Sequence, residues 1–394
     1  MNTDPIVLVS FARTPIGNLL GELKDFSAYE LGAHAINAAV LRAHLNPADI
    51  GEVWMGCVLP AGQGQAPARQ AALLAKLPDS TPCTTLNKVC GSGMKAIMCA
   101  HDALQVGSAS MMVAGGMESM TNAPYLLLKA RQGYRLGHSE IYDHMMMDGL
   151  EDAYDRGKSM GCFAEECAKQ YHFTRKQQDD YAASSFERAQ YAIREKLFTN
   201  EIAPLVQQTK QGEQIIENDE HPFSVNPEKI PLLKAAFIQD GTVTAGNSSS
   251  IADGAAAVTL MRESEALKRG IQPIARIVGH QSSAKAPRQF TTAPIDATSA
   301  LLSRIGWKID EVDLFEVNEA FVVVALAFMH DLRIPREKVN VHGGACALGH
   351  PIGASGARVL VTLLSALQQN ELKRGIATLC IGGGEATAMA IEMY

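Results

Sequence analysis

The feature that most constrains the fold of this chain is a pattern that occurs twice. In the first half, residues 89–93 (VCGSG) precede a helix-like stretch, and 111–118 (MMVAGGME) then form an apolar run that ends in glycines and a glutamate. In the second half, residues 353–357 (GASGA) open a helix-like stretch, and 378–385 (TLCIGGGE) follow it. Two similar βαβ halves packed together would place their helix-opening turns around one shared cleft. Chance similarity between glycine-rich turns is the alternative.

Short apolar runs alternate with helical periodicity over much of the chain. Strands are predicted at 6–10, 53–58 and 109–114, and an amphipathic helix is predicted at 29–44. Short buried strands separated by helices are typical of an α/β sheet that is covered on both faces. We therefore predict the α/β fold class.

The middle of the chain breaks this alternation. Residues from about 120 to 247 are richer in polar side chains and give few strand signals, although 175–196 has the pattern of a surface helix. We interpret residues 120–247 as an inserted loop domain. It would separate an N-terminal half, residues 1–119, from a C-terminal half, residues 248–394.

Bulk properties exclude several classes of protein. A net charge of −7 over 394 residues argues against a nucleic-acid-binding surface. The eight cysteines form no C-x-x-C pair and no zinc-ligand spacing, which predicts no metal site and a reducing compartment. The N-terminus lacks the pattern of a signal peptide, and the apolar run at 321–329 is too short to span a bilayer. We expect a soluble, cytoplasmic protein with no membrane partner.

Cys90 stands at the turn before the first helix-like stretch. An apolar run leads into it, and Gly91 and Gly93 follow. This order predicts a thiol at a helix N-terminus, where free N–H groups and the helix dipole favour the thiolate over the thiol. The glycines leave room for a substrate, and a thiolate is a competent nucleophile. Cys90 is therefore the predicted nucleophile.

Three glycine-rich or polar runs in the C-terminal quarter supply candidate partners for this thiol. They are 318–321 (NEAF), 343–356 (GGACALGHPIGASG) and 380–384 (CIGGG). Glycine at this density costs backbone entropy, and it is tolerated most easily where the backbone must approach a ligand.

Four side chains in these runs are candidates for chemistry. His350 lies in a glycine-rich loop before a helix start, which favours a catalytic over a purely structural role. Asn318 could hold a water or merely cap a helix. Cys346 and Cys380 are both candidates for a second thiol, and the residues alone do not rank them, since free cysteine is often buried and inert.

Taken in order, four motifs resemble those of the thiolase family. They are residues 89–93, 318–321, 349–351 (GHP) and 380–384, supported by 115–120 (GGMESM) and 241–247 (GTVTAGN). The resemblance covers essentially the whole chain and is closest to the short-chain, biosynthetic members, the acetyl-CoA acetyltransferases. It implies a thiolase-like duplicated αβαβα five-layer fold with an inserted loop domain that carries coenzyme A (CoA)-binding and tetramerisation segments.

The resemblance also implies a ping-pong reaction that joins two acetyl-CoA into acetoacetyl-CoA and CoA, and its reversal by thiolysis. Cys90 would become acetylated while His350 takes its proton. Cys380 would then remove a proton from the second acetyl-CoA. His350 and a water on Asn318 would stabilise one developing oxyanion, and the N–H groups of Cys90 and Gly382 the other. CoA is a substrate and product here, and no cofactor is implied.

The family pattern further implies residues that hold CoA. Ser249 would contact the pantetheine arm, with an apolar wall and a group of residues near the reacting end. The wall is Leu233, Ala236, Phe237 and Ala245, and the residues near the reacting end are Met160, Ala320 and Phe321. The chain departs from a common family pattern at Ser159, where many members have histidine. Glu385 stands where a small or apolar residue is frequent, and no role is assigned to it.

Other readings stay open at this point. One is a degradative 3-oxoacyl-CoA thiolase with a broader chain-length range. Another is a decarboxylating condensing enzyme, which would need a second histidine or an asparagine in place of Cys380; His342 is a possible second histidine. A non-catalytic acyl-CoA-binding module would lack Cys90, His350 or Cys380, and all three are present. A cysteine hydrolase would have no use for a second thiol.

The segment 120–147 is rich in aromatic and aliphatic residues. Packing in a core is the default interpretation for such residues. In short-chain thiolases the matching segment joins dimers into tetramers, so the resemblance implies a homotetramer built as a dimer of dimers. A dimer is the alternative.

Overall fold

The N-terminal half builds a mixed sheet with helices on both faces. The computed structural model describes residues 4–210 and 212–394. The elements of this half are β1 (Ile6–Arg13), β2 (Gly17–Asn18), α1 (Ala28–Arg42), β3 (Glu52–Gly56), α2 (Pro67–Leu74), β4 (Cys83–Leu86), α3 (Ser92–Gln105), β5 (Met111–Ser119) and β10 (Ala252–Arg262). The predicted strands at 6–10, 53–58 and 109–114 correspond to β1, β3 and β5, and the helix at 29–44 corresponds to α1.

The C-terminal half repeats this chain path. Its elements are β11 (Ala275–Ala284), α8 (Ala293–Ile305), β12 (Leu314–Val317), α9 (Val322–Leu332), α10 (Ala345–Leu348), α11 (Ile352–Gln369), β13 (Arg374–Ile381) and β14 (Glu385–Met393). The short helix α7 (Glu263–Lys268) connects the two halves.

Strand pairing confirms the duplication. In the first half β3 runs parallel to β5, which pairs antiparallel with β10, which pairs antiparallel with β1. In the second half β12, β13, β14 and β11 are paired in the same parallel, antiparallel, antiparallel sequence. A short pairing of β1 with β11 joins the two sheets, so the strand order is β12-β13-β14-β11-β1-β10-β5-β3-β4.

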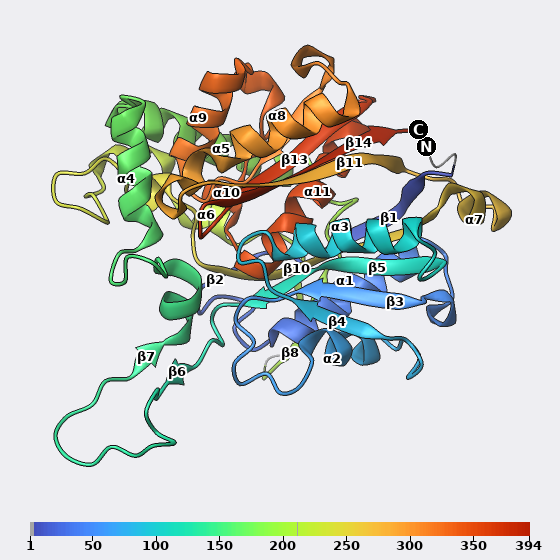
Figure 1. Ribbon diagram of the computed structural model, residues 1–394, viewed down its shortest axis with the longest axis horizontal. Helices are drawn as coiled ribbons and strands as arrows, with labels where there is room; N and C mark the ends of the chain where they lie inside the picture. The colour runs from blue at the N-terminus through green and yellow to red at the C-terminus, as the bar shows by residue number, and fades with distance from the viewer. Residues whose placement is uncertain (1–3, 211) are drawn as a thin grey trace.

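The helices complete five layers (Figure 1). Helices α1 and α2 cover the outer face of the first sheet, and α8 covers the outer face of the second. Helices α3 and α11 form the middle layer, where α11 is buried from Ile352 to Leu367. The two middle helices approach closely at glycines: a Cβ at Gly93 would lie 2.8 Å from the nitrogen of Ala357. The predicted αβαβα architecture is therefore confirmed.

Local sequence signals set where several helices begin and end. Helix α1 begins with a capping box, in which the Ser27 hydroxyl accepts from the Glu30 N–H and the Glu30 carboxylate accepts from the Ser27 N–H. Helix α5 (Arg175–Arg194), which the sequence predicts at 175–196, begins with the equivalent pair Thr174 and Gln177. Helix α8 ends at Gly306, whose φ of +75° suits glycine.

One predicted boundary is wrong. Residues 248–394 were expected to form the C-terminal half, but β10 (Ala252–Arg262) lies between β1 and β5 in the first sheet. The first half therefore extends beyond the inserted segment, and the halves divide between β10 and β11. The cause is the insertion itself, which separates β10 in sequence from the sheet that it completes.

The inserted segment contains mainly helices and short hairpins. Its elements are β6 (Tyr125–Leu126), β7 (Tyr142–Asp143), a π-helix (Met146–Leu150), α4 (Met160–Gln170), α5, β8 (Leu205–Thr209), β9 (Gly212–Ile216), α6 (His221–Ser224) and 3₁₀ turns at Pro227–Leu232 and Ala245–Asn247. Four further 3₁₀ turns lie at Pro47–Asp49, Pro287–Thr292, Ile309–Glu311 and Arg336–Lys338. None of the described helices is long and apolar enough to cross a membrane.

The β6–β7 segment projects from the body as an extended arm (Figure 1). Met120 and Met145 at its base are buried, but most apolar side chains between them are exposed, and Leu136 is 100% exposed. The exposed set is Tyr125, Leu127, Leu128, Tyr134, Leu136, Ile141 and Tyr142. The core interpretation of this segment is therefore wrong for the arm, because the arm extends away from both halves.

Candidate active site

Cys90 lies in a tight turn between β4 and α3. Val89 has a φ of +46°, a conformation that is rare for a β-branched residue and is often found at functional sites. The Ser92 hydroxyl holds this turn, since it accepts from the Lys88 N–H at 2.8 Å and donates to the Val89 carbonyl at 2.6 Å. The turn presents the thiol at the start of α3, as the sequence predicts.

The protonation state of Cys90 differs from the expectation. Burial raises the pKa of the Cys90 thiol to about 11, and hydrogen bonds from the backbone N–H groups of Gly382 and of Cys90 itself lower it only in part. Desolvation disfavours the charged form and outweighs the favourable position at the helix start. The resting group is therefore the thiol, and it needs a base to become a nucleophile.

Cys380 and Gly382 approach Cys90 from the other half of the chain. Cys380 is buried near the end of β13, and burial together with the neighbouring Cys90 raises the pKa of its thiol. The N–H of Gly382 is a hydrogen-bond donor to the Cys90 sulfur. A Cβ at position 382 would meet Val89 and Met160 only at 3.6 and 3.8 Å.

His350 and Asn318 form a second buried pair. Nε2 of His350 lies 3.4 Å from Nδ2 of Asn318, and Nδ1 lies 2.5 Å from the hydroxyl of Ser355. That hydroxyl donates to the carbonyl of Pro351 at 2.9 Å and therefore accepts from Nδ1–H. This leaves Nε2 as the basic nitrogen. Among the described residues, Oδ1 of Asn318 has no hydrogen-bond partner although it is buried, which suits an atom that holds a water or ligand.

The electrostatic setting keeps the imidazole neutral. Burial, and secondarily the Arg358 guanidinium, lowers the pKa of His350 from 6.5 to about 3. A neutral imidazole with Nε2 free can accept a proton at any pH near neutrality. Cys90 packs against a small apolar cluster that includes Ile352, two residues beyond His350.

The structure separates the two candidate second thiols. The sulfur of Cys346 donates to the carbonyl of Gly246 at 3.2 Å, and burial and the Glu319 carboxylate raise the pKa of its thiol. Cys380 instead lies beside Cys90. Cys346 is therefore a buried structural thiol, which the sequence could not distinguish because both cysteines stand near glycines.

Glu319 is a buried residue whose part in the site was not predicted. Its carboxylate accepts from Tyr181, Ser185, Asn340 and the N–H of Cys346. These bonds fix the strand end that carries Asn318 against the loop that carries His350. The only feature of the sequence that could have revealed the role of Glu319 is its position next to Asn318. No feature of the sequence could have revealed Ser355, because serine is common near the start of a helix.

The residues predicted to hold CoA gather along one wall. The N–H and hydroxyl of Ser249 both donate to the carbonyl of Ala320 at 3.0 Å, and the rings of Phe237 and Phe321 pack edge to face at 5.7 Å. Ala236 donates to the carbonyl of Val243, and Leu233 packs on Gly246, next to Ala245. Met160 reaches toward Gly382 and so links the wall with the thiols.

Two departures from the family pattern lie close by. The hydroxyl of Ser159 is 3.8 Å from the sulfur of Cys162 and does not cap α4. Glu385, to which the sequence assigned no role, forms an ion pair with Lys88. This pair joins the Cys90 turn to the Gly382–Gly384 turn across the two halves.

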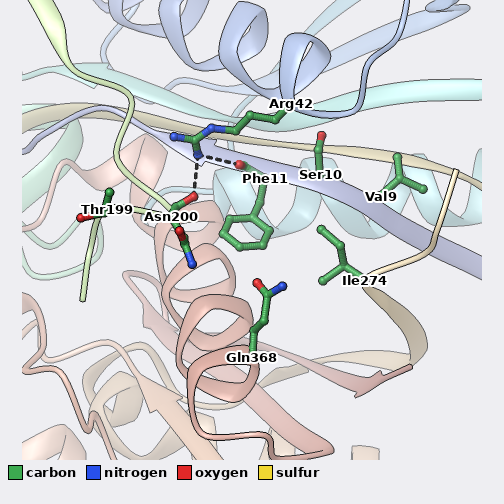
Figure 2. Close-up of a pocket in the computed structure, with 8 residues that line it drawn as sticks. All are labelled: Val9, Ser10, Phe11, Arg42, Thr199, Asn200, Ile274 and Gln368. Atoms are coloured by element: carbon green, nitrogen blue, oxygen red, sulfur yellow. Dashed lines mark hydrogen bonds between the residues drawn. The ribbon is translucent and has the colours of Figure 1, made fainter. Parts of the chain in front are cut away.

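A separate cavity of about 370 Å³ contains none of the predicted site residues. Figure 2 shows the Arg42 side chain at its edge, where the guanidinium donates to the carbonyls of Phe11 and Asn200. Further bonds to Glu201 and Ile202 occupy the same guanidinium. Among the described residues that line the cavity, Arg42 is the one cation, and its guanidinium is held by these carbonyls.

Comparison with known proteins decides the family. The family model described as "Thiolase, N-terminal domain" matches residues 6–264, and "Thiolase, C-terminal domain" matches residues 271–393. The chain belongs to the thiolase family. The gap between the two matches lies between β10 and β11, where the two sheets of this thiolase divide.

Individual relatives match this thiolase over almost its full length. Acetyl-CoA acetyltransferase 1 of Arabidopsis thaliana is 48% identical over 390 residues, which cover 98% of this chain and 94% of the relative. The crystal structure of the Bacillus anthracis acetyl-CoA acetyltransferase has a TM-score of 0.96 at 39% identity and covers 99% of both chains. The Acat5 thiolase of Ascaris suum, solved in complex with coenzyme A, has a TM-score of 0.93 at 40% identity, covering 99% of this chain and 100% of that one.

Proposed function

We propose that this thiolase is an acetyl-CoA C-acetyltransferase that condenses two acetyl-CoA and, in reverse, cleaves acetoacetyl-CoA with CoA. The observation that carries the proposal is the meeting of two thiols from opposite halves, with the Gly382 N–H donating to the Cys90 sulfur. One thiol is needed for acyl transfer and the other for proton transfer at carbon. The names of the relatives from Arabidopsis thaliana and Bacillus anthracis support the choice of acetyl-CoA.

In the first step Cys90 attacks the thioester carbon of acetyl-CoA. Nε2 of His350 takes the thiol proton, which the high pKa of Cys90 makes necessary. A C–S bond forms to Cys90, the C–S bond to CoA breaks, and the leaving CoA thiolate takes the proton. The N–H groups of Cys90 and Gly382 stabilise the oxyanion of the acyl-enzyme.

In the second step the proton of the Cys380 thiol passes to Nε2 of His350, and the resulting thiolate removes a proton from the methyl carbon of another acetyl-CoA. Its burial suits this role, since a desolvated thiolate is a strong base. His350 and a water held by Oδ1 of Asn318 stabilise the enolate oxygen. The enolate carbon attacks the acetyl carbon on Cys90, the C–S bond breaks, and the Cys90 thiolate takes up the proton held by His350, which leaves both cysteines as thiols again.

Ser249 and the apolar wall would hold the pantetheine arm, and Met160, Ala320 and Phe321 would lie near the reacting end. The wall is Leu233, Ala236, Phe237 and Ala245. The CoA complex of the Ascaris suum relative supports CoA as the ligand. These steps use only thiols, an imidazole, a bound water and N–H groups, so we propose no cofactor. The eight free thiols suit a reducing, cytoplasmic setting, with short-chain acyl-CoA of fatty-acid metabolism as substrates.

The test is thiolysis of acetoacetyl-CoA by CoA, followed for the native protein and for Cys90→Ala, Cys380→Ala and the control Cys346→Ala. Native turnover, the near-complete loss of it in the first two variants and its retention in the control support the proposal. Loss in the Cys346 variant alone, or no native turnover, contradicts it. Faster cleavage of longer 3-oxoacyl-CoA by the native protein would favour the broader degradative activity.

We also infer that the β6–β7 arm joins dimers into a homotetramer. An arm that exposes Leu127, Leu128, Leu136 and Ile141 to water is typical of an interaction surface. Light scattering should give a tetramer for the native protein and a smaller assembly for Leu136→Asp, with Leu267→Asp on α7 as an exposed control. A native dimer, or an unchanged mass for Leu136→Asp, would contradict this assembly.

A further inference from the structure

Three metal-ligating side chains meet on the seam between the two halves, far from the thiols. His101 and Asp102 lie in α3, and His280 lies in β11. Nδ1 of His101 is 3.0 Å from Oδ1 of Asp102, Nε2 of His280 is 2.9 Å from the same oxygen, and the two nitrogens are 3.3 Å apart. Three potential ligand atoms therefore form one small triangle.

The size of this triangle is that of neighbouring ligands around a single ion. Imidazole nitrogens and carboxylate oxygens bind Zn²⁺ at about 2.0–2.2 Å. At that bond length, adjacent ligands of an octahedral or tetrahedral ion are about 3.0–3.5 Å apart. The three atoms therefore have the separations that ligands of one such ion require.

The surroundings are those of a site with one open side. Both histidines are buried, whereas the side chain of Asp102 is 58% exposed, which gives an ion access from solvent. Nε2 of His101 lies 3.1 Å from the side-chain amide of Gln105, whose oxygen can accept from Nε2–H after rotation of the amide when Nδ1 binds an ion. Arg304 donates to the carbonyl of His280 at 3.0 Å, and its charge weakens but does not block the binding of a cation.

We propose that His101, Asp102 and His280 bind one divalent transition-metal ion of the kind that prefers imidazole, with Zn²⁺ as the fitting example. Two neutral nitrogens and one carboxylate favour such an ion over Mg²⁺ or Ca²⁺, which prefer oxygen ligands. The sequence could not reveal the site because His101 and His280 are 179 residues apart.

The ion would act on stability and not on the thiolase reaction. Helix α3 begins at Ser92, just after Cys90, and Asp102 lies about 15 Å further along its axis. An ion held there would cross-link α3 of the first half to β11 of the second. Because only the folded chain brings these residues together, binding would stabilise the folded state by mass action.

The experiment is a Co²⁺ titration of the reduced full-length chain after chelator treatment, read by visible absorption and repeated with Zn²⁺ as a thermal shift. The native chain is compared with His280→Gln and with Asp102→Asn, which should fold because Asp102 is exposed. His330→Gln is the matched control, since Nδ1 of His330 lies 2.8 Å from Oδ1 of its neighbour Asp331 without a second histidine.

The proposal predicts about one Co²⁺ per chain, with no thiolate charge-transfer band, and at least about tenfold weaker binding in both site variants. The control should bind like the native chain, and Zn²⁺ should raise the melting temperature of the native chain and the control only. Absence of binding, binding through thiolates alone, or equal affinity in the site variants and the control would overturn it.

Discussion

The hydroxyl of Ser355 lies 2.5 Å from Nδ1 of His350 and determines which nitrogen of the imidazole carries the proton. Because the same hydroxyl donates to the carbonyl of Pro351, it can only accept from the ring. Nδ1 is therefore protonated, and Nε2 is free toward Asn318. A serine one turn into α11 thus sets the orientation and tautomer of the proposed base.

Replacing Ser355 by alanine should lower kcat for thiolysis about tenfold, because the loss of one hydrogen bond to the ring costs about 1.4 kcal/mol. KM for acetoacetyl-CoA should change little, since the hydroxyl does not reach the CoA wall. Ser365→Ala on the same helix is the control, and Ser355→Thr should restore part of the rate. Equal kcat in Ser355→Ala and the control would contradict the role of Ser355.

The raised pKa of Cys90 predicts slow alkylation at neutral pH. Only the thiolate reacts with iodoacetamide, and burial moves the pKa of the thiol to about 11. The rate of Cys90 modification, measured by peptide mapping, should therefore rise about tenfold for each pH unit between about 7 and 9. A plateau below about pH 8 would instead indicate a thiolate stabilised by an imidazolium, and would contradict the neutral pair.

His342 should make the folded state sensitive to acid. It packs edge to face on Phe198, 5.9 Å between ring centres, and burial, with Arg188, lowers its pKa from 6.5 to about 4. Between these two pKa values the unfolded chain binds a proton that the folded chain does not, so stability falls as pH drops from about 6.5 to about 4.

The variant His342→Gln removes this contribution. Between pH 7.5 and 5, its free energy of unfolding in urea should decrease by about 2 kcal/mol less than that of the native chain. His330→Gln, at an exposed histidine, is the control and should follow the native chain. An equal decrease for all three proteins would show that His342 is not a source of acid sensitivity.

The sequence predicts most of the fold and the candidate site because both depend on local patterns. Cys90, Asn318, His350 and Gly382 stand at strand ends and helix starts, which residue type and glycine spacing reveal. The structure places Gly382 of the second half against Cys90 of the first, and His350 beside Asn318. The arrangement of the chain in two similar halves was also predictable, because the same pattern of strand, glycine turn and helix occurs twice in the sequence.

Other features could not be predicted because they depend on distance and burial in three dimensions. The pKa of Cys90 follows from desolvation by the second half, which outweighs the helix start. The choice between Cys346 and Cys380 depends on which thiol faces Cys90. The position of β10 in the first sheet could not be predicted, because an insertion of more than a hundred residues separates β10 from the other strands of that sheet. A single sequence does not show which strands β10 pairs with.

The most direct test of the account is the acylation of Cys380→Ala by acetyl-CoA, measured by mass spectrometry after an acid quench and mapped to a peptide. The account predicts about one acetyl group per chain, on Cys90, with no acetoacetyl-CoA formed, because acyl transfer needs only Cys90 and His350. Failure to acetylate Cys90, acetylation at another thiol such as Cys346, or continued formation of acetoacetyl-CoA would contradict the assignment of nucleophile and carbon base to the two thiols.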